Sequence, residues 1–520
     1  MGFCIAETKY GAVKGERIDG AGADVCVWRG IPYAAPPVGA LRFREPLPPE
    51  RWNGVRDALE FGPACPQGVR VKGRAEVRNM SEDCLTLNIW APADESASAE
   101  HSKKTRPVFF YIHGGSFIEG SGGDEEYDST ELVKNGDIIV VTLNYRLGAL
   151  GFMDFSFLDE SFKPNTGLMD IVMALRWVHE NIGAFGGDKN NVTICGQSAG
   201  ATCAGVLPMI GEARQYFNRA IMMSAVPELI HSQGQAAEIA KCFLEFNDIG
   251  GAEALKNADA LALASRQDEF AQKSGLGVDA FSISIDGELV KSYMIPAAKE
   301  GMMEGVPMLI GTTREEMSFA LFKQLSYIAD IENIKKISSE SESEEVKKRI
   351  ADAYGRYGKR GEAIMYTDFC FRLPGLWFAE AQSGHADTWM YRFDFETFGM
   401  RISRLHAFHS CDVPFLFGNF KAGLAKLMVL VSPVKTNIRK VHAEFQGDFL
   451  AFIRTGELPW EKCGAGNTPA KCYNLPSTIE PVIPYDVKQA YAGSEFERRV
   501  SAGEVIEIMV RKNEKAVDCG

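Results

Sequence analysis

Short, uninterrupted runs of apolar residues recur along the chain, and they constrain the fold more than any other feature. They occupy residues 108–112, 138–143, 192–195 and 219–223, with further candidates at 307–310 and 388–393. Such runs are typical of parallel strands that helices cover on both faces. Between them, residues 169–182 repeat apolar side chains at helical spacing. The pattern predicts an α/β fold with a doubly wound, mostly parallel sheet.

The domain organisation follows from what the chain lacks. Its 520 residues contain no internal repeat and no low-complexity linker, so we expect one catalytic domain spanning residues 1–520. Two helix-rich, polar regions, at about 230–300 and 320–385, are expected to be insertions that cover one end of the sheet.

Net charge and the absence of targeting signals limit the expected binding partners and cellular location. The net charge of −13 disfavours nucleic acid and anionic membranes. The chain contains no run of eighteen apolar residues, the length needed to span a bilayer. The first residues turn polar too early for a signal peptide. We therefore expect a cytoplasmic protein of bacterial type, whose twelve cysteines are mostly reduced.

A G-x-S-x-G sequence at residues 196–200 follows the apolar run 192–195 and precedes an alanine-rich segment. A serine on a sharp strand-to-helix turn needs small neighbours, because the two elements approach closely there. The helix that follows offers its dipole and free N–H groups to a developing oxyanion. Ser198 is therefore the candidate nucleophile.

A second glycine motif, His113-Gly-Gly-Ser-Phe, directly follows the apolar run 108–112. Paired glycines let the backbone turn its N–H groups toward a reacting oxygen. Gly114 and Gly115, with the N–H of Ala199, are the expected oxyanion hole. A phosphate-binding loop is the alternative interpretation, but the Lys-Ser/Thr ending of a P-loop is missing.

The base and the acid should follow the nucleophile in the chain. Residues 405–418 place His406 and His409 in a loop before an apolar run, and spacing alone does not choose between them. Glu315 and Glu316 end the stretch after residues 307–310, and either could orient the imidazole.

Several longer motifs match a known family across nearly the whole chain. They are RGIPYAAPPVG at 29–39, LRF at 41–43, SEDCLTLNIW at 81–90, NYRLGALGF at 144–152, FGGD at 185–188, GTTREE at 311–316 and TDFCFR at 367–372. With the serine motif, they make the chain resemble the type-B carboxylesterases, above all the bacterial para-nitrobenzyl esterases and more distantly the cholinesterases. The resemblance implies the α/β-hydrolase fold, with a large mixed, mostly parallel sheet and helical insertions over the active-site end.

The resemblance also assigns roles that spacing leaves open. It implies a triad of Ser198, Glu316 and His409, with His406 as a structural neighbour. It places Cys65 and Cys84 at the positions of a possible disulfide found in many relatives, and whether the two are bonded stays open. It also implies two ion pairs, Arg42 with Glu82 and Arg146 with Asp170. We expect a serine carboxylesterase that acts on small esters with short to medium acyl chains or aryl groups, without cofactor or metal. The oligomeric state stays open.

Four positions depart from the family pattern, namely Gln197, Met317, Ile171 and Val226. Cholinesterases carry glutamate at the place of Gln197, so its neutral side chain argues against choline esters. Phe117, Gln197, Phe319 and Phe408 are expected to shape the substrate pocket. Two alternatives remain: a non-catalytic adhesion protein, as neuroligin-like relatives are, and a hydrolase of amide, carbamate or thioester bonds.

Overall fold

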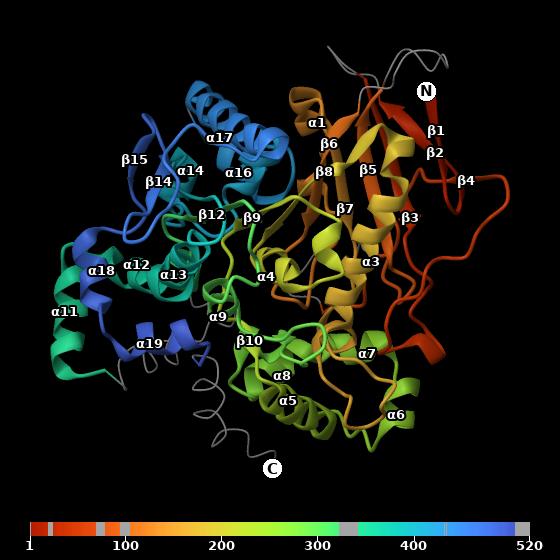
Figure 1. Cartoon of the computed structure of the whole chain (residues 1–520), viewed down its shortest axis with the longest axis horizontal. Helices are drawn as coiled ribbons and strands as arrows, with labels where there is room; N and C mark the ends of the chain where they lie inside the picture. Colours follow the sequence, from red (N-terminus) through yellow and green to blue (C-terminus); the bar gives the residue numbers. More distant parts are fainter. Residues whose placement is uncertain are drawn as a thin grey trace.

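The computed structural model describes residues 2–18, 24–68, 79–93, 105–321, 342–430, 432 and 434–504. Its centre is one sheet of thirteen strands, in the order β1-β2-β3-β5-β7-β6-β8-β9-β12-β13-β14-β15, with β4 paired to β2 (Figure 1). The strands are β1 (Gly2–Thr8), β2 (Gly11–Ile18), β3 (Val25–Pro32), β4 (Val55–Asp57), β5 (Thr86–Pro92), β6 (Arg106–Ile112), β7 (Ile139–Leu143), β8 (Gly187–Gln197), β9 (Arg219–Met223), β12 (Met308–Thr313), β13 (Thr388–Phe393), β14 (Pro469–Tyr473) and β15 (Thr478–Pro481).

The middle of this sheet is parallel, and its flanks are antiparallel. Strands β7, β6, β8, β9, β12, β13 and β14 run in one direction. The six apolar runs of the sequence all lie on these parallel strands, so the predicted doubly wound core is confirmed. Antiparallel pairing joins β1, β2, β3, β5 and β7 on one side and β14 and β15 on the other. The whole sheet is therefore mixed but mostly parallel, as the resemblance implied.

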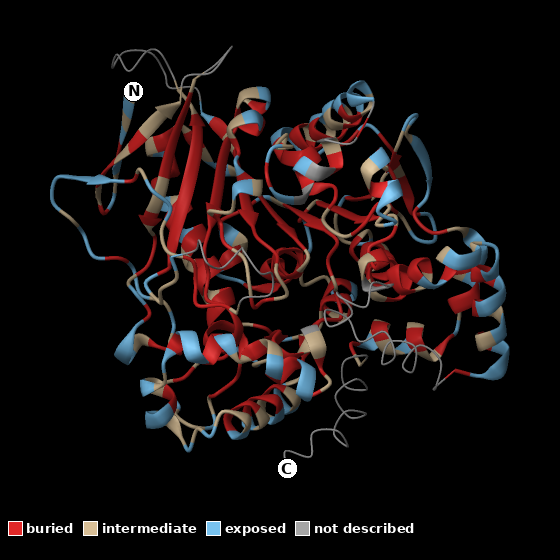
Figure 2. Ribbon diagram, turned by 180° about the vertical axis from the view of Figure 1, so that it is seen from behind, coloured by how far each residue is buried: buried red, intermediate tan, exposed pale blue. Residues whose placement is uncertain are grey.

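Helices cover both faces. The helices are α1 (Thr130–Gly136), α2 (Gly148–Phe152), α3 (Thr166–Asn181), α4 (Ala199–Val206), α5 (Gln233–Phe246), α6 (Ala252–Asn257), α7 (Ala260–Ser265), α8 (Gln267–Lys273), α9 (Met294–Lys299), α11 (Glu344–Gly355), α12 (Gly361–Thr367), α13 (Leu373–Gln382), α14 (Phe398–Ile402), α15 (Val413–Phe417), α16 (Gly423–Leu430), α17 (Lys435–Thr455), α18 (Tyr485–Tyr491) and α19 (Glu495–Ala502). Successive strand side chains enter two separate apolar cores. Val108, Phe110 and Ile112 of β6 pack with α3, α4 and α13, whereas Phe109 and Tyr111 pack with α1, α15 and α17. Figure 2 shows the strands buried between these layers.

The two expected insertions are helical where the structure describes them. Residues 230–300 form α5 to α9 and a small parallel pair, β10 (Ile230–His231) with β11 (Ile283–Ser284). Figure 1 shows α5 to α8 as a layer beyond the end of the main sheet. Residues 342–385 contain α11, α12 and α13, and residues 322–341 of the second expected insertion lie outside the described residues.

The structure answers the open question of cysteine pairing. Cys65 and Cys84 are buried free thiols that hydrogen-bond to each other. The disulfide joins Cys4 of β1 to Cys26 of β3. Strands β1 and β3 both pair with β2, and the Cα atoms of the two cysteines lie 6.1 Å apart. That is a favourable separation for the bond.

Membrane insertion finds no support in the described ranges, where no helix combines the length and apolar character that a bilayer crossing requires.

Candidate functional site

Ser198 lies at the turn between β8 and α4 in a strained backbone conformation, with φ 56° and ψ −125°. Its N–H donates to Met223 O at the end of the neighbouring strand (2.9 Å). A Cβ on Gly196 would lie 2.0 Å from Gly200 O, and one on Gly200 would lie 2.2 Å from Ile112 O. The strand, the turn and the helix therefore approach so closely that both glycines are required. A non-glycine residue held at positive φ in such a turn is typical of functional sites.

The paired glycines after β6 lie against this serine. A Cβ on Gly114 would come within 2.7 Å of Gln197 O and 3.2 Å of the Cβ of Ser198. Gly115 has φ +117°, and Glu119 O occupies the space that a side chain would need. The N–H of Ala199 opens helix α4, where helical amides have no internal partner. The backbone of Gly114 thus lies against the serine turn, and the oxyanion hole of Gly114, Gly115 and Ala199 stays a prediction.

Glu316 is fully buried three residues beyond β12 and accepts three hydrogen bonds. Ser224 Oγ donates to Glu316 Oε1 (2.6 Å), and so does the backbone N–H of Thr313 (2.6 Å). Nδ1 of His409 lies 2.6 Å from Glu316 Oε2. Burial raises the pKa of the Glu316 carboxyl, but the charge of His409 and these hydrogen bonds outweigh it, so the net pKa is lowered. The carboxylate is therefore held ionised beside the imidazole.

The other ring nitrogen of His409, Nε2, lies 3.0 Å from the side-chain amide of Gln197. Among the described residues no hydrogen bond joins the hydroxyl of Ser198 to His409. Gln197 directly precedes the serine, so the imidazole lies over the same turn. Catalytic hydrogen bonds are often long or absent before a substrate binds. The structure therefore brings Ser198, His409 and Glu316 to one edge of the sheet, with the Gln197 amide on the nitrogen that a general base would use.

His406 and Glu315, the alternative candidates for the base and the acid, lie in a separate cluster. Nδ1 of His406 lies 3.3 Å from Glu396 Oε2, and Arg360 pairs with both Glu396 and Glu315. Ligand atoms of His406, Glu396 and Glu315 lie within 4.8 Å of one another, a spacing that could hold a metal ion. The guanidinium of Arg360 already supplies positive charge there. Neither Glu315 nor His406 reaches the imidazole of His409 in the described contacts.

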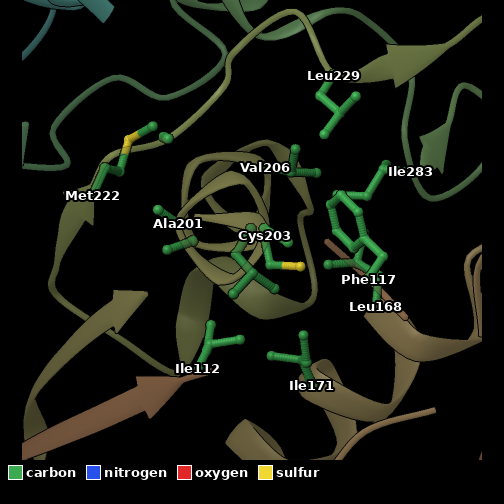
Figure 3. Packing of buried hydrophobic residues seen from close by; sticks show 14 of the residues in the cluster. Ile112, Phe117, Leu168, Ile171, Ala201, Cys203, Val206, Met222, Leu229 and Ile283 are labelled. Atoms are coloured by element: carbon green, nitrogen blue, oxygen red, sulfur yellow. The ribbon is translucent and has the colours of Figure 1, made fainter. Parts of the chain in front are cut away.

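Aromatic rings flank His409. The ring centroid of Phe371 lies 5.2 Å from the imidazole, and that of Phe319 lies 6.3 Å away. Phe371 is a site neighbour that the residue-by-residue reading did not single out, although it lies in the TDFCFR motif. Phe117 is fully buried against Phe152 in the core around α4 (Figure 3). Phe408 is buried in the core on the opposite face of the sheet. The pocket roles of Phe117 and Phe408 stay predictions.

Both expected ion pairs are present and bidentate. Nε and Nη2 of Arg42 donate to Glu82 at 2.7 and 2.5 Å, and Arg42 also donates to backbone carbonyls before α7. Arg146 binds Asp170 of α3 at 2.8 and 2.6 Å, with both side chains buried. Bidentate geometry and burial distinguish these pairs from ordinary surface charges. The first pair joins the loop after β3 to the loop before β5 and to the end of α6, and the second joins the loop after β7 to α3.

One further buried acid near the site was not predicted from the sequence. Asp412 is wholly buried three residues after His409, and Tyr391 Oη donates to its Oδ2 (2.9 Å). Burial, followed by the negative charge of Glu316, raises the pKa of Asp412 to about 7. The signal that could have found it is its position in residues 405–418, three residues after His409 and directly before the apolar run.

Comparison with known proteins identifies the family of the chain. The model of the family described as "Carboxylesterase family" matches residues 4–470. The chain is 36% identical over 472 residues to a para-nitrobenzyl esterase of Bacillus subtilis, covering 90% of this chain and 92% of that protein. It is 32% identical to a phenmedipham hydrolase of Pseudarthrobacter oxydans, covering 87% and 90%.

Solved structures give the same result. A PNB esterase structure superposes with a TM-score of 0.81 at 34% identity, covering 94% of this chain and 99% of that one. A carboxylesterase from Geobacillus stearothermophilus gives 0.78 at 33% identity, covering 96% and 99%. The chain belongs to the carboxylesterase family, has the α/β-hydrolase fold and is a carboxylic ester hydrolase.

Proposed function

We propose that this chain hydrolyses esters through an acyl-enzyme formed on Ser198, with His409 as general base and Glu316 as its orienting acid. The observation that carries the proposal is the 2.6 Å contact between His409 and Glu316, at the edge of the sheet where the strained Ser198 turn lies. A carboxylate on Nδ1 keeps the proton there and leaves Nε2 free to accept one.

The reaction has two matched steps. Nε2 of His409 takes the hydroxyl proton as Ser198 Oγ bonds to the ester carbonyl carbon. The carbonyl π electrons move to oxygen, return as the alcohol leaves, and the imidazolium gives its proton to that alcohol. Water then attacks the acyl-enzyme with the same base, which releases the acid and restores the serine. Glu316 stays ionised throughout and stabilises the imidazolium.

The developing oxyanion would be held by the N–H groups of Gly114, Gly115 and Ala199. In the described part of the chain the amides of Gly114 and Gly115 have no protein acceptor, so they can donate to a ligand without breaking another bond. Preorganised donors of this kind supply much of the rate enhancement in acyl transfer.

We propose a substrate range of small esters with short to medium acyl chains or aryl groups. Support comes from the aromatic rings of Phe319 and Phe371 beside His409 and from the relative named para-nitrobenzyl esterase. We also propose that residues 1–520 act as one catalytic domain, because the thirteen-stranded sheet runs without interruption from β1 to β15.

The test compares the turnover of p-nitrophenyl acetate and longer acyl homologues by three proteins: wild type, Ser198→Ala and Ser265→Ala. Ser265 is exposed at the end of α7 and serves as the matched control. We expect Ser198→Ala to lose at least about 10⁴-fold in kcat while remaining folded, and the control to match wild type. Full turnover by Ser198→Ala would overturn the proposal.

A further inference from the structure

Two acidic side chains lie together close to the serine turn, and the proposed mechanism does not use them. Glu228 belongs to the segment between β9 and β10, and Asp279 to a short 3-10 helix (Gly277–Ala280). The charge of Asp279 acts on Glu228, and both act on the thiol of Cys370. Three segments far apart in sequence thus meet at this acidic pair.

The pair is incomplete as it stands. Glu228 is 8% exposed, and its Oε2 atom is buried without a hydrogen-bond partner among the described residues. Close by, His231 contacts the backbone of Asp279, and its Nε2 atom is likewise buried and unpartnered. Buried polar atoms without partners are costly and rare in native proteins. They are expected where a ligand completes the site.

The ligand that would complete the pair of Glu228 and Asp279 should carry a positive charge. Burial and the neighbouring Asp279 raise the pKa of Glu228 well above its usual value, and burial raises the pKa of Asp279 to about 7. Within the described ranges no lysine or arginine is among the groups that act on these two carboxyls. A cation placed between them would favour their ionised forms, and its N–H could donate to the unpartnered Oε2 of Glu228.

The pair also lies along the segments that build the serine site. Ser224 binds Glu316, and the N–H of Val226 donates to Thr202 of α4, so Glu228 is only four residues beyond a direct contact of Glu316. The next residue, Leu229, belongs to the same apolar cluster as Val206 of α4 (Figure 3). On the other side Cys370 precedes Phe371, whose ring contacts His409. A group bound at the pair would therefore be close to an ester held at the serine.

We propose that Glu228 and Asp279 form a recognition site for a protonated amine carried by the ester substrate. The inference rests on the proposed function, because it assumes hydrolysis at Ser198. An organic cation is favoured over a metal ion, since among the described residues these side chains do not gather three ligand atoms at metal-binding spacing. The site offers a charge-assisted acceptor at Glu228 and a second carboxyl at Asp279.

The test uses two pairs of esters with matched shapes, measured by pH-stat at pH 7.5. For an amine on the acyl side, methyl 3-(dimethylamino)propanoate is compared with methyl 4-methylpentanoate. For an amine on the alcohol side, 2-(dimethylamino)ethyl acetate is compared with 3-methylbutyl acetate. The readout is the ratio of kcat/KM for the cationic ester to that for its neutral partner, so a general loss of activity cancels.

We expect Glu228→Gln to lower this ratio by about tenfold or more in one of the two pairs, the size of a lost charge-assisted hydrogen bond. Asp279→Asn should lower it in the same pair, and it provides the test should Glu228→Gln fail to fold. Glu300→Gln, on the exposed end of the α9 region, is the control and should keep the wild-type ratio. Wild-type ratios in both Glu228→Gln and Asp279→Asn would overturn the proposal.

These outcomes separate the two proposals. Turnover of the neutral esters that survives Ser198→Ala would remove the proposed function. If neutral-ester turnover depends on Ser198 but the ratio of cationic to neutral kcat/KM is unchanged in Glu228→Gln and Asp279→Asn, only the amine-site proposal is overturned.

Discussion

The side-chain amide of Gln197 lies 3.0 Å from Nε2 of His409, the nitrogen that must accept the proton of Ser198. With Nδ1 donating to Glu316, Nε2 carries the acceptor lone pair, and the amide N–H satisfies it. Before proton transfer this hydrogen bond has to be exchanged for one from Ser198. Gln197 thus competes with the nucleophile for the base in the unliganded enzyme.

Replacing Gln197 by alanine should remove the competition. A neutral hydrogen bond contributes about 1 kcal/mol net, so we expect Gln197→Ala to raise kcat for a small ester about fivefold. Steady-state kinetics with p-nitrophenyl acetate would measure it. A fall in kcat would mean that the amide instead holds the ring in its productive orientation.

The negative charge of Glu316 should raise kcat, because it stabilises the imidazolium of His409. Glu316→Gln keeps the shape and can still meet Ser224 and the N–H of Thr313, but it no longer stabilises the imidazolium and can reverse the tautomer of His409. We expect kcat to fall by roughly 10⁴-fold. Single-turnover release of p-nitrophenol would check it, and a loss below tenfold would contradict an orienting role for this carboxylate.

The same residue predicts a dependence of stability on pH. Because the folded-state pKa of Glu316 is lowered from 4.5, its ionised form stabilises the fold above that pH. This contribution is lost as pH falls from 4.5 through the folded-state pKa. Urea unfolding of wild type and Glu316→Gln between pH 6 and acid pH should show the steeper decline in the wild type.

The glycine loop gives a steric prediction. A methyl group at Gly114 would lie 2.7 Å from Gln197 O, so Gly114→Ala must displace the loop from the serine. We expect kcat to fall by about 10²- to 10³-fold, as for loss of an oxyanion donor. Gly183→Ala, where the added methyl would meet nothing within 4 Å, is the matched control. Equal kcat values for the two variants would argue against an oxyanion role.

Local signals carried most of the prediction from sequence. Six of the seven parallel strands carry an apolar run, whereas β14, with the sequence PAKCY, does not. The glycines around Ser198 are recognisable from the G-x-S-x-G motif alone. The pairing of His409 with Glu316 needed the family motifs, because their 93-residue separation leaves no local trace. Contacts that depend on rotamers, such as Gln197 with His409, could not be inferred from spacing.

Cysteine pairing could not be predicted for a related reason. The family positions pointed to Cys65 and Cys84 and left their bonding open, whereas the disulfide joins Cys4 of β1 to Cys26 of β3, two strands that both pair with β2. None of these flanking antiparallel strands was predicted. Strands β1 and β2 mix apolar with charged residues and glycines, so they lack the continuous apolar runs of the parallel strands.

The disulfide itself can be tested by peptide mapping. Without reductant, trypsin should release the peptide of residues 1–9 joined to that of residues 18–29, while Cys65 and Cys84 should react with a thiol reagent after unfolding. Closing a loop of this size stabilises by about 3 kcal/mol, so Cys4→Ser should lower the free energy of unfolding. Recovery of both peptides unlinked would contradict the pairing.

Asp412 gives a prediction of opposite sign to that for Glu316. Its folded-state pKa is raised from 3.8 to about 7, so the folded protein holds this proton more tightly than the unfolded chain, and stability declines as pH rises from 3.8 to 7. Asp412→Asn keeps an acceptor for Tyr391 Oη and cannot ionise. Above pH 7 the variant should therefore be more stable than wild type by about 2 to 4 kcal/mol, and this advantage should shrink toward pH 4. Urea unfolding at pH 5 and pH 8 measures the difference, with Asp352→Asn on the exposed face of α11 as control. An advantage independent of pH would show that Asp412 does not titrate in this range.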